Sequence, residues 1–381
     1  MTGWSVVGCP VTGRTVSRHA RARHARSLVA GLCALFAALA TRAGAQSAPA
    51  VPARAPWSDP SPHRARLIQV APDVQLEVLD WGGPASGTLA AGGASPGGSG
   101  PPLVLLAGSG NSAHVFDGFA PRFTSRFRVL GISRRGIGAS SRPASGYTTA
   151  TLARDVVAVL DTLGIPKATF AAHSFGGSEL HALGADHAGR VAGLVYLDAA
   201  YDYHALVHSP EDRSGALATP EPPEAGYWDD TVGSWTLLAE RLSGPAYPEA
   251  EVRTLFVFDS AGRWVRRATA DSLRLWYDRG IERVDLRRLR VPALAIYAVP
   301  GSAETMLPYW ATLDRAGRAR GERSYAGLSA LLGRLRAQFR ADVPGARVVV
   351  IPGARHYVFL THPGEATHAM LEFLLPPHAP R

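Results

Sequence analysis

Short apolar runs alternate with helical patterns along most of this chain. The segments that we interpret as strands are residues 74–79, 103–107, 127–132, 168–172, 191–197, 293–297 and 348–351. The clearest helical pattern places Leu152, Val156, Val159, Leu160 and Leu163 on one face. Such an alternation predicts an α/β fold: a mostly parallel sheet with helices on both faces. Active residues are then expected in loops at the carboxyl ends of the strands.

Two stretches interrupt this pattern. Residues 82–102 are almost wholly Gly, Ala, Ser and Pro, which predicts a long loop between two strands. Residues 201–290 are rich in aromatic side chains and show no strand repeat, which predicts a helical cap inserted over the site. A surface insertion without a role in the site is the alternative. The core would comprise residues 66–200 and 291–381.

The first 45 residues have the composition of a secretory signal peptide. Six arginines and no acidic residue occur there, and an apolar run over residues 28–40 leads to Ala43-Gly44-Ala45. The apolar run is short for a membrane span. We therefore predict cleavage after Ala45, export to a periplasm or the medium, and no membrane anchor afterwards. Residues 46–65, rich in Ala, Pro and Ser, would form a flexible leader.

Charge and cysteine content change this picture little. The formal net charge is +9, but the predicted signal peptide carries six of the positive charges. The remainder is spread out and does not indicate a nucleic-acid surface. Cys9 and Cys33 both lie in the signal peptide, so the mature protein would have no disulfide. Its core alone must stabilise it, and a chain of this size can bury a large one.

The strongest chemical signal is the sequence Ala172-His173-Ser174-Phe175-Gly176, directly after an apolar run. It is Gly-x-Ser-x-Gly with one substitution, the pattern of a sharp strand-to-helix turn that exposes a serine hydroxyl. Ser174 is therefore the candidate nucleophile. An ordinary loop whose serine caps the following helix is the competing interpretation.

A serine nucleophile needs a histidine base that is oriented by a carboxylate. His356 follows the last predicted strand by a short loop, at the same sheet edge as Ser174. For the acid we favour Asp198, which ends the strand after the nucleophile strand. Glu304 and Asp202 are the alternatives that the sequence leaves open.

Acyl transfer also requires hydrogen-bond donors for a developing oxyanion. The backbone N–H of Phe175 stands at a helix start, and that of Ser109 lies in the loop Gly108-Ser109-Gly110. This loop also imitates a dinucleotide fingerprint, but no acid ends the next strand, so no cofactor is expected. His204 and His208 have helical spacing without an apparent third ligand, so no metal is expected either.

These features together resemble the α/β-hydrolase family over residues 103–375. The chain order Ser174, Asp198, His356 is that of the family's triad. Residues 135–140, Arg-Gly-Ile-Gly-Ala-Ser, resemble its Arg-Gly-x-Gly-x-Ser turn, and residues 353–356 resemble its histidine loop.

The sequence departs from the family pattern in three places. Ala107-Gly108 replaces the usual His-Gly, and Ser133-Arg134 replaces the usual Asp-Arg. Residues 298–301 carry no acid where most members have one. Some members, including certain haloalkane dehalogenases, have it one strand after the nucleophile, where Asp198 stands. A dehalogenase or epoxide hydrolase activity is disfavoured because those relatives have Asp in place of Ser174.

The resemblance and the residues together predict an exported serine hydrolase that cleaves a carboxylic ester or related acyl bond without a cofactor. The aromatic cap favours a small apolar or aromatic acyl substrate. An acyltransferase or peptidase of the same fold is an alternative. A non-catalytic ligand-binding protein on this scaffold is a second, and cofactor-free haloperoxidase chemistry a third.

Overall fold

The computed structural model describes residues 57–84, 100–215, 217–221 and 231–375. Its centre is an eight-stranded sheet in the order β1-β2-β4-β3-β5-β6-β9-β10. The strands are β1 (Arg64–Ala71), β2 (Val74–Gly82), β3 (Pro102–Leu106), β4 (Arg128–Ser133), β5 (Ala168–His173), β6 (Val191–Leu197), β9 (Ala293–Val299) and β10 (Arg347–Pro352). Strand β2 is antiparallel to β1 and β4, and every other pairing in this sheet is parallel. The predicted mostly parallel sheet is thus confirmed.

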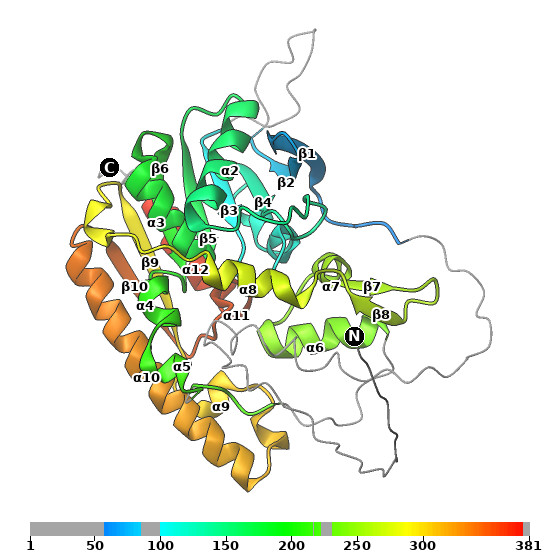
Figure 1. Cartoon of the computed structure of the whole chain (residues 1–381), viewed down its shortest axis with the longest axis vertical. Helices are drawn as coiled ribbons and strands as arrows, with labels where there is room; N and C mark the ends of the chain where they lie inside the picture. Colours follow the sequence, from blue (N-terminus) through cyan, green and yellow to red (C-terminus); the bar gives the residue numbers. More distant parts are fainter. Residues whose placement is uncertain (1–56, 85–99, 216, 222–230, 376–381) are drawn as a thin grey trace, which may run out of the picture.

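Helices cover both faces of the sheet (Figure 1). They are α2 (Thr149–Thr162), α3 (Gly176–Asp186), α4 (Tyr203–Val207), α5 (Pro210–Arg213), α6 (Val232–Ser243), α7 (Glu249–Leu255), α8 (Asp271–Arg279), α9 (Ala303–Met306), α10 (Arg315–Asp342), α11 (Val358–Thr361) and α12 (Pro363–Leu374). Neighbouring residues of β3 enter different apolar clusters: Val104 packs with α2 and α3, whereas Leu105 packs with α12. The sheet is therefore buried on both sides, as its continuous apolar runs require.

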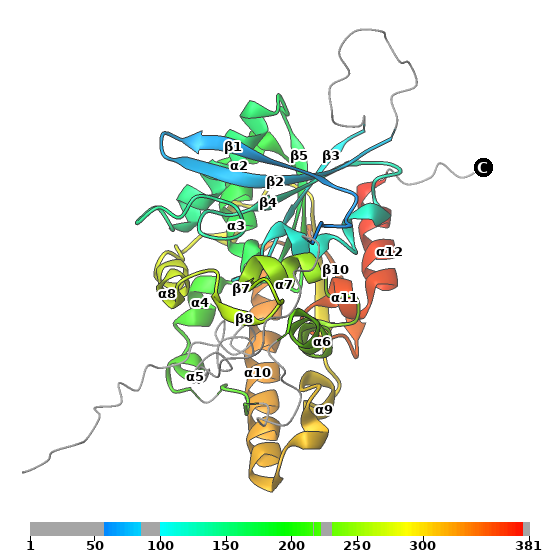
Figure 2. The same ribbon diagram turned by 90° about the vertical axis from the view of Figure 1, so that its right-hand side faces the viewer.

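The segment between β6 and β9 lies on one side of the sheet in both views (Figures 1 and 2). It contains α4 to α8 and a small antiparallel pair, β7 (Phe256–Phe258) and β8 (Trp264–Arg267). The helical insertion predicted for residues 201–290 thus also includes a hairpin. In the described part of the chain, no helix is both long enough and apolar enough to cross a membrane.

Outside the insertion, strand β1 and helix α10 were also not foreseen from the sequence. Strand β1 begins at Arg64, two residues before the predicted core, and only Ile68 of its eight residues is buried, so it has no continuous apolar run. Helix α10 buries a seam that starts with Gly317, Gly321 and Ser324 before reaching leucines, so its apolar repeat is weak at the start. Gly321 is needed there because a Cβ would lie 2.7 Å from the Trp310 ring.

Several predictions lie outside the described residues. These are the signal peptide over residues 1–45, residues 46–56 of the leader and residues 85–99 of the Gly/Ala/Pro-rich loop. Tyr227 and Trp228 of the predicted cap are also outside them.

Candidate active site

Ser174 occupies the sharp turn between β5 and α3. Its φ of +49° is in the left-handed region, which is unusual for a residue other than glycine. Such a turn needs small neighbours. A Cβ on Gly176 would lie 3.0 Å from both the Ala107 carbonyl oxygen and the Ala172 Cβ, and one on Gly177 would lie 2.0 Å from the Ala199 carbonyl oxygen. The two glycines therefore let the helix start close to the sheet and leave the Ser174 hydroxyl at the strand end.

His356 lies between Ser174 and Asp198. Its Nε2 is 2.8 Å from Ser174 Oγ, and its Nδ1 is 2.8 Å from Asp198 Oδ2. Because an ionised carboxylate only accepts hydrogen bonds, Nδ1 carries the proton and Nε2 is left as the acceptor for the serine hydroxyl. The three candidates come from three separate loops at the carboxyl edge of the sheet.

The other two candidate acids, Asp202 and Glu304, lie at the start of α4 and on α9. Asp202 accepts a hydrogen bond from Ala205 N and caps α4, and Glu304 is exposed on α9. Asp198 also has a positive φ, +49°, which turns its side chain at the end of β6. Its second oxygen accepts from Tyr201 Oη at 2.7 Å and from Ala298 N at 3.2 Å.

His173 is buried beside the candidate nucleophile, and among the described residues no hydrogen bond joins its ring to the Ser174 hydroxyl. Its Nε2 lies 3.1 Å from the His356 carbonyl oxygen, and the two rings lie 4.6 Å apart between centroids. Burial, together with the nearby His356, lowers the pKa of His173 well below its usual value. The neutral ring therefore packs beside His356 and contacts its backbone carbonyl.

The backbone N–H groups of Ser109 and Phe175 have no hydrogen-bond acceptor among the described residues. Arg134 determines the course of the Ser109 loop: its guanidinium donates to the carbonyls of Ala107 at 2.5 Å and Gly108 at 2.8 Å. Glu179 of α3 holds Arg134 in a buried ion pair of 2.7 Å. Because the carbonyls of Ala107 and Gly108 are bound to Arg134, the backbone N–H of Ser109 is left available for another hydrogen-bond acceptor.

Sequence reasoning missed a buried network around Glu251 of α7. The Glu251 carboxylate accepts from Asn111 Nδ2 at 2.9 Å, from Ser112 N at 3.0 Å and from the Ser112 hydroxyl. Tyr357, next to His356, donates to Asn111 Oδ1 at 2.9 Å. Burial raises the pKa of Glu251 to about 7, although the hydrogen bonds oppose this. The network joins the insertion to the Ser109 and His356 loops, and no local sequence pattern signals it.

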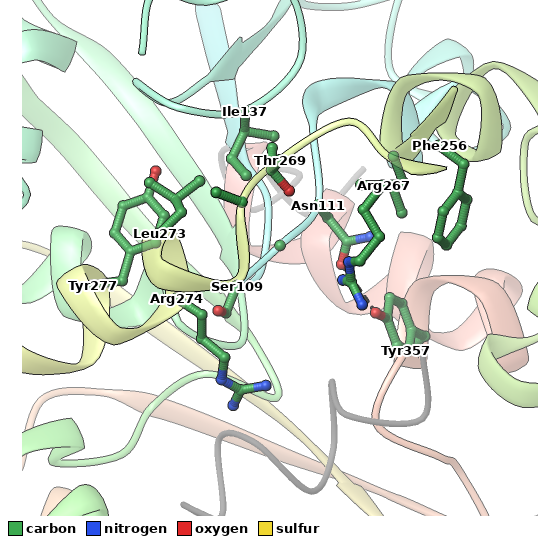
Figure 3. A pocket seen from close by; sticks show the side chains of 13 residues that line it. Ser109, Asn111, Ile137, Phe256, Arg267, Thr269, Leu273, Arg274, Tyr277 and Tyr357 are labelled. Atoms are coloured by element: carbon green, nitrogen blue, oxygen red, sulfur yellow. Dashed lines mark hydrogen bonds between the residues drawn. The ribbon is translucent and has the colours of Figure 1, made fainter. Parts of the chain in front are cut away.

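Two cavities flank this arrangement. One, of about 190 Å³, is lined by Ser109, Asn111 and Tyr357 of the core and by the β7–α8 part of the insertion. Figure 3 shows Arg267 pointing toward Asn111 and Tyr357, with Ser109 in the middle of the lining. The other cavity, of about 150 Å³, is lined in part by Asp198 and His356.

Comparison with known proteins identifies the family. A family model described as the alpha/beta hydrolase fold matches residues 101–363. The chain belongs to the alpha/beta hydrolase fold family. This alpha/beta hydrolase is 25% identical over 280 residues to a 2-(acetamidomethylene)succinate hydrolase of Mesorhizobium japonicum, covering 73% of the chain and 89% of the relative. A fluoroacetate dehalogenase of a Burkholderia species is 33% identical over 107 residues, 27% of the chain and 35% of the relative.

Solved structures agree with the fold of this alpha/beta hydrolase. The structure of E-2-(acetamidomethylene)succinate hydrolase superposes with a TM-score of 0.57 at 19% identity, covering 82% of this chain and 99% of that one. A thioesterase domain from the curacin biosynthetic pathway gives a TM-score of 0.54 at 14% identity, covering 81% and 98%. At these identities the likeness concerns the fold alone.

The histidine pair noted in the sequence is formed by His204 of α4 and by His208, which caps the end of this helix. The rings of His204 and His208 stack with centroids 4.2 Å apart, and His208 Nδ1 bonds to the His204 carbonyl. Within the described ranges, neither residue belongs to a group of three or more possible metal ligands.

Proposed function

We propose that this alpha/beta hydrolase is a serine hydrolase that cleaves a carboxylic ester or a related acyl bond. The observation that carries the proposal is the pair of 2.8 Å contacts that His356 makes with Ser174 and Asp198. That geometry is the one a hydroxyl nucleophile needs, because the base must reach the hydroxyl proton and be held by a carboxylate.

The proposed reaction uses the chain's own residues. Ser174 Oγ attacks the acyl carbon while His356 Nε2 takes the hydroxyl proton, and Asp198 stabilises the imidazolium that forms. The N–H groups of Ser109 and Phe175 bind the oxyanion of the tetrahedral intermediate. His356 returns the proton to the leaving alcohol or amine, and an acyl group stays on Ser174. Water, deprotonated by His356, then releases the acid and regenerates the hydroxyl.

The cavity beside Ser109 supports a substrate that is partly apolar and carries an acidic group. Ile137, Leu273 and Tyr277 supply apolar surface, in line with the apolar or aromatic substrate expected from the cap. Arg267 and Arg274 line the same cavity, and a guanidinium favours a carboxylate ligand. Arg274 also lies 3.7 Å from the Asp278 carboxylate of its own helix, so Arg267 is the better placed of the two for such a ligand.

Amide hydrolysis is the second candidate function. It is favoured by the relative named for hydrolysing 2-(acetamidomethylene)succinate, whose name describes a dicarboxylate that carries an acetamido group. The two arginines of the cavity suit such an acidic amide as well as an acidic ester. Transfer of the acyl group to an alcohol or amine would use the same acyl-enzyme.

Labelling with a fluorophosphonate probe tests the proposal, with Ser174→Ala beside the wild type. We expect stoichiometric labelling that the substitution abolishes. Matched esters and amides, each with and without a carboxylate, then separate the candidate functions by kcat/KM. Labelling that persists in Ser174→Ala would place the nucleophile elsewhere. A folded wild type with neither labelling nor turnover would favour a ligand-binding role.

We also propose that the protein is exported and that residues 1–45 are removed. The basic and apolar composition of this segment supports the proposal. Amino-terminal sequencing of protein from the periplasm or medium should begin at Gln46, whereas recovery from the cytoplasm with residues 1–45 intact would contradict it.

A further inference from the structure

Four side chains that can bind a metal meet outside the Ser174 site. Asp59 and His63 precede β1, whereas His114 belongs to the short helix η2 (Ala113–Phe116) and Asp117 follows it. Their potential ligand atoms all lie within 4.8 Å of one another. The expectation of no metal rested on His204 and His208 alone. The four residues of this group form two pairs about fifty positions apart with no familiar spacing between them, so the sequence does not signal them.

The contacts within this group link all four side chains. Asp117 contacts both imidazoles: Oδ1 is 2.9 Å from His63 Nδ1, and Oδ2 is 3.2 Å from His114 Nδ1. His114 Nδ1 also lies 3.3 Å from Asp59 Oδ2. One N–H proton can point well at only one of the two carboxylates that face it. A cation between the side chains could bind one atom of each of the four residues at once.

The separations match a tetrahedral zinc ion. Zinc binds imidazole nitrogen and carboxylate oxygen at about 2.0–2.2 Å, so neighbouring ligand atoms of a tetrahedron lie roughly 3.3–3.6 Å apart. The contacts that join these four residues, 2.9, 3.2, 3.3 and 3.6 Å, are of similar size. The first two reach different oxygens of Asp117, so this carboxylate and the His63 ring would turn slightly to present one atom each to the ion. Two imidazoles favour zinc over calcium or magnesium, which prefer oxygen ligands.

The surroundings also resemble those of a built metal site. The side chains of His63, His114 and Asp117 are only 5%, 11% and 4% exposed. Trp81 Nε1 donates to Asp117 Oδ1 at 3.2 Å, and the far nitrogen of His114 lies 3.7 Å from a Glu77 oxygen. Outer contacts of this kind orient metal ligands and set the histidine tautomer.

We propose that Asp59, His63, His114 and Asp117 bind one structural Zn²⁺. Four protein ligands leave no open position for a reactant, so the ion would stabilise the fold and take no part in the chemistry. It would fasten the segment before β1 to η2, which directly follows the loop that carries Ser109.

Zinc binding by the full mature chain, without an affinity tag, tests this proposal. After chelator treatment, calorimetric titration with Zn²⁺ should give one site per chain, and bound zinc should raise the unfolding temperature. His63→Gln and Asp117→Asn should each weaken binding by more than about 100-fold, since even loss of an outer contact costs 10- to 100-fold. His204→Gln, which breaks the histidine pair on α4, is the control and should bind like the wild type.

The proposal would be overturned if the wild type binds no zinc, or if the variants at His63 and Asp117 bind zinc as the wild type does. The four residues would then form a metal-free ion-pair network. If these variants do not fold, X-ray absorption of the zinc-loaded wild type decides. Two imidazoles and two oxygen ligands are expected, and any other set contradicts the assignment. Binding is measured directly, so failure here is independent of the Ser174 mechanism.

Discussion

At the residue scale, the roles proposed for the three candidate side chains depend on what else each one contacts. Asp198 is held by Tyr201 and by the Ala298 backbone as well as by His356. Ala298 lies near the end of β9, just before the turn in which most family members carry their acid. The backbone at the end of β9 thus holds the Asp198 carboxylate, which comes from the end of β6.

Replacing Asp198 with Asn tests that role. The amide keeps the size of the side chain but cannot hold Nδ1–H of His356 as a carboxylate does, so we expect kcat to fall by roughly three to four orders of magnitude. Asp202→Asn and Glu304→Gln are matched controls and should change kcat less than about twofold. A large loss in Glu304→Gln with none in Asp198→Asn would transfer the role to Glu304.

At the element scale, the placing of Ser174 depends on how closely α3 can approach the sheet. The five-residue pattern emphasises Gly176, but Gly177 has the tighter surroundings, because it faces the backbone after β6. Backbone cannot rotate away as a flexible side chain can. The start of α3 is therefore fixed by a neighbouring strand connection and by its own sequence together.

Gly177→Ala should destabilise the protein and displace the serine. The added Cβ would lie 2.0 Å from the Ala199 carbonyl oxygen, so a backbone shift is unavoidable. We expect a loss of about 3 kcal/mol in the free energy of unfolding, at the upper end for overpacking, measured by chemical denaturation. Gly189→Ala, which meets nothing within 4 Å, should change stability by less than about 1 kcal/mol. Equal stability of the two variants would contradict this account.

At the scale of the whole molecule, the inserted segment is anchored to the core through a titratable group. Glu251 comes from the insertion, whereas Asn111 and Ser112 come from the loop after β3. The pKa of Glu251 in the folded state, about 7, is above its ordinary value of 4.5. Between these values the folded protein holds more protons than the unfolded chain, so the stability from this site falls as pH rises through that window.

Glu251→Gln should remove this dependence because Gln imitates the protonated acid. Between pH 5 and pH 8 the wild type should lose at most roughly 3 kcal/mol relative to the variant. Chemical denaturation of both proteins at the two pH values measures the difference. Glu249→Gln, on the more exposed face of the same helix, is the control and should follow the wild type. A difference between wild type and Glu251→Gln that is the same at both pH values would contradict the expected titration.

The sequence by itself determined the features that depend on neighbours in the chain. Apolar runs located most of the sheet, and the residues around Ser174 predicted a sharp turn, because strand burial and turn sterics act over a few residues. It also ranked Asp198 ahead of Glu304, from their positions after successive strands.

Only the tertiary structure decided which distant groups meet. Asn111 and Glu251 are separated by 140 positions, and His63 and Asp117 by 54, so no local spacing reports these contacts. They arise because the segment between β3 and β4 packs against both the insertion and the chain before β1. Which of these distant side chains meet is determined by the topology of the fold. A buried polar network is stabilising only when each of its hydrogen-bonding groups has its partner in place.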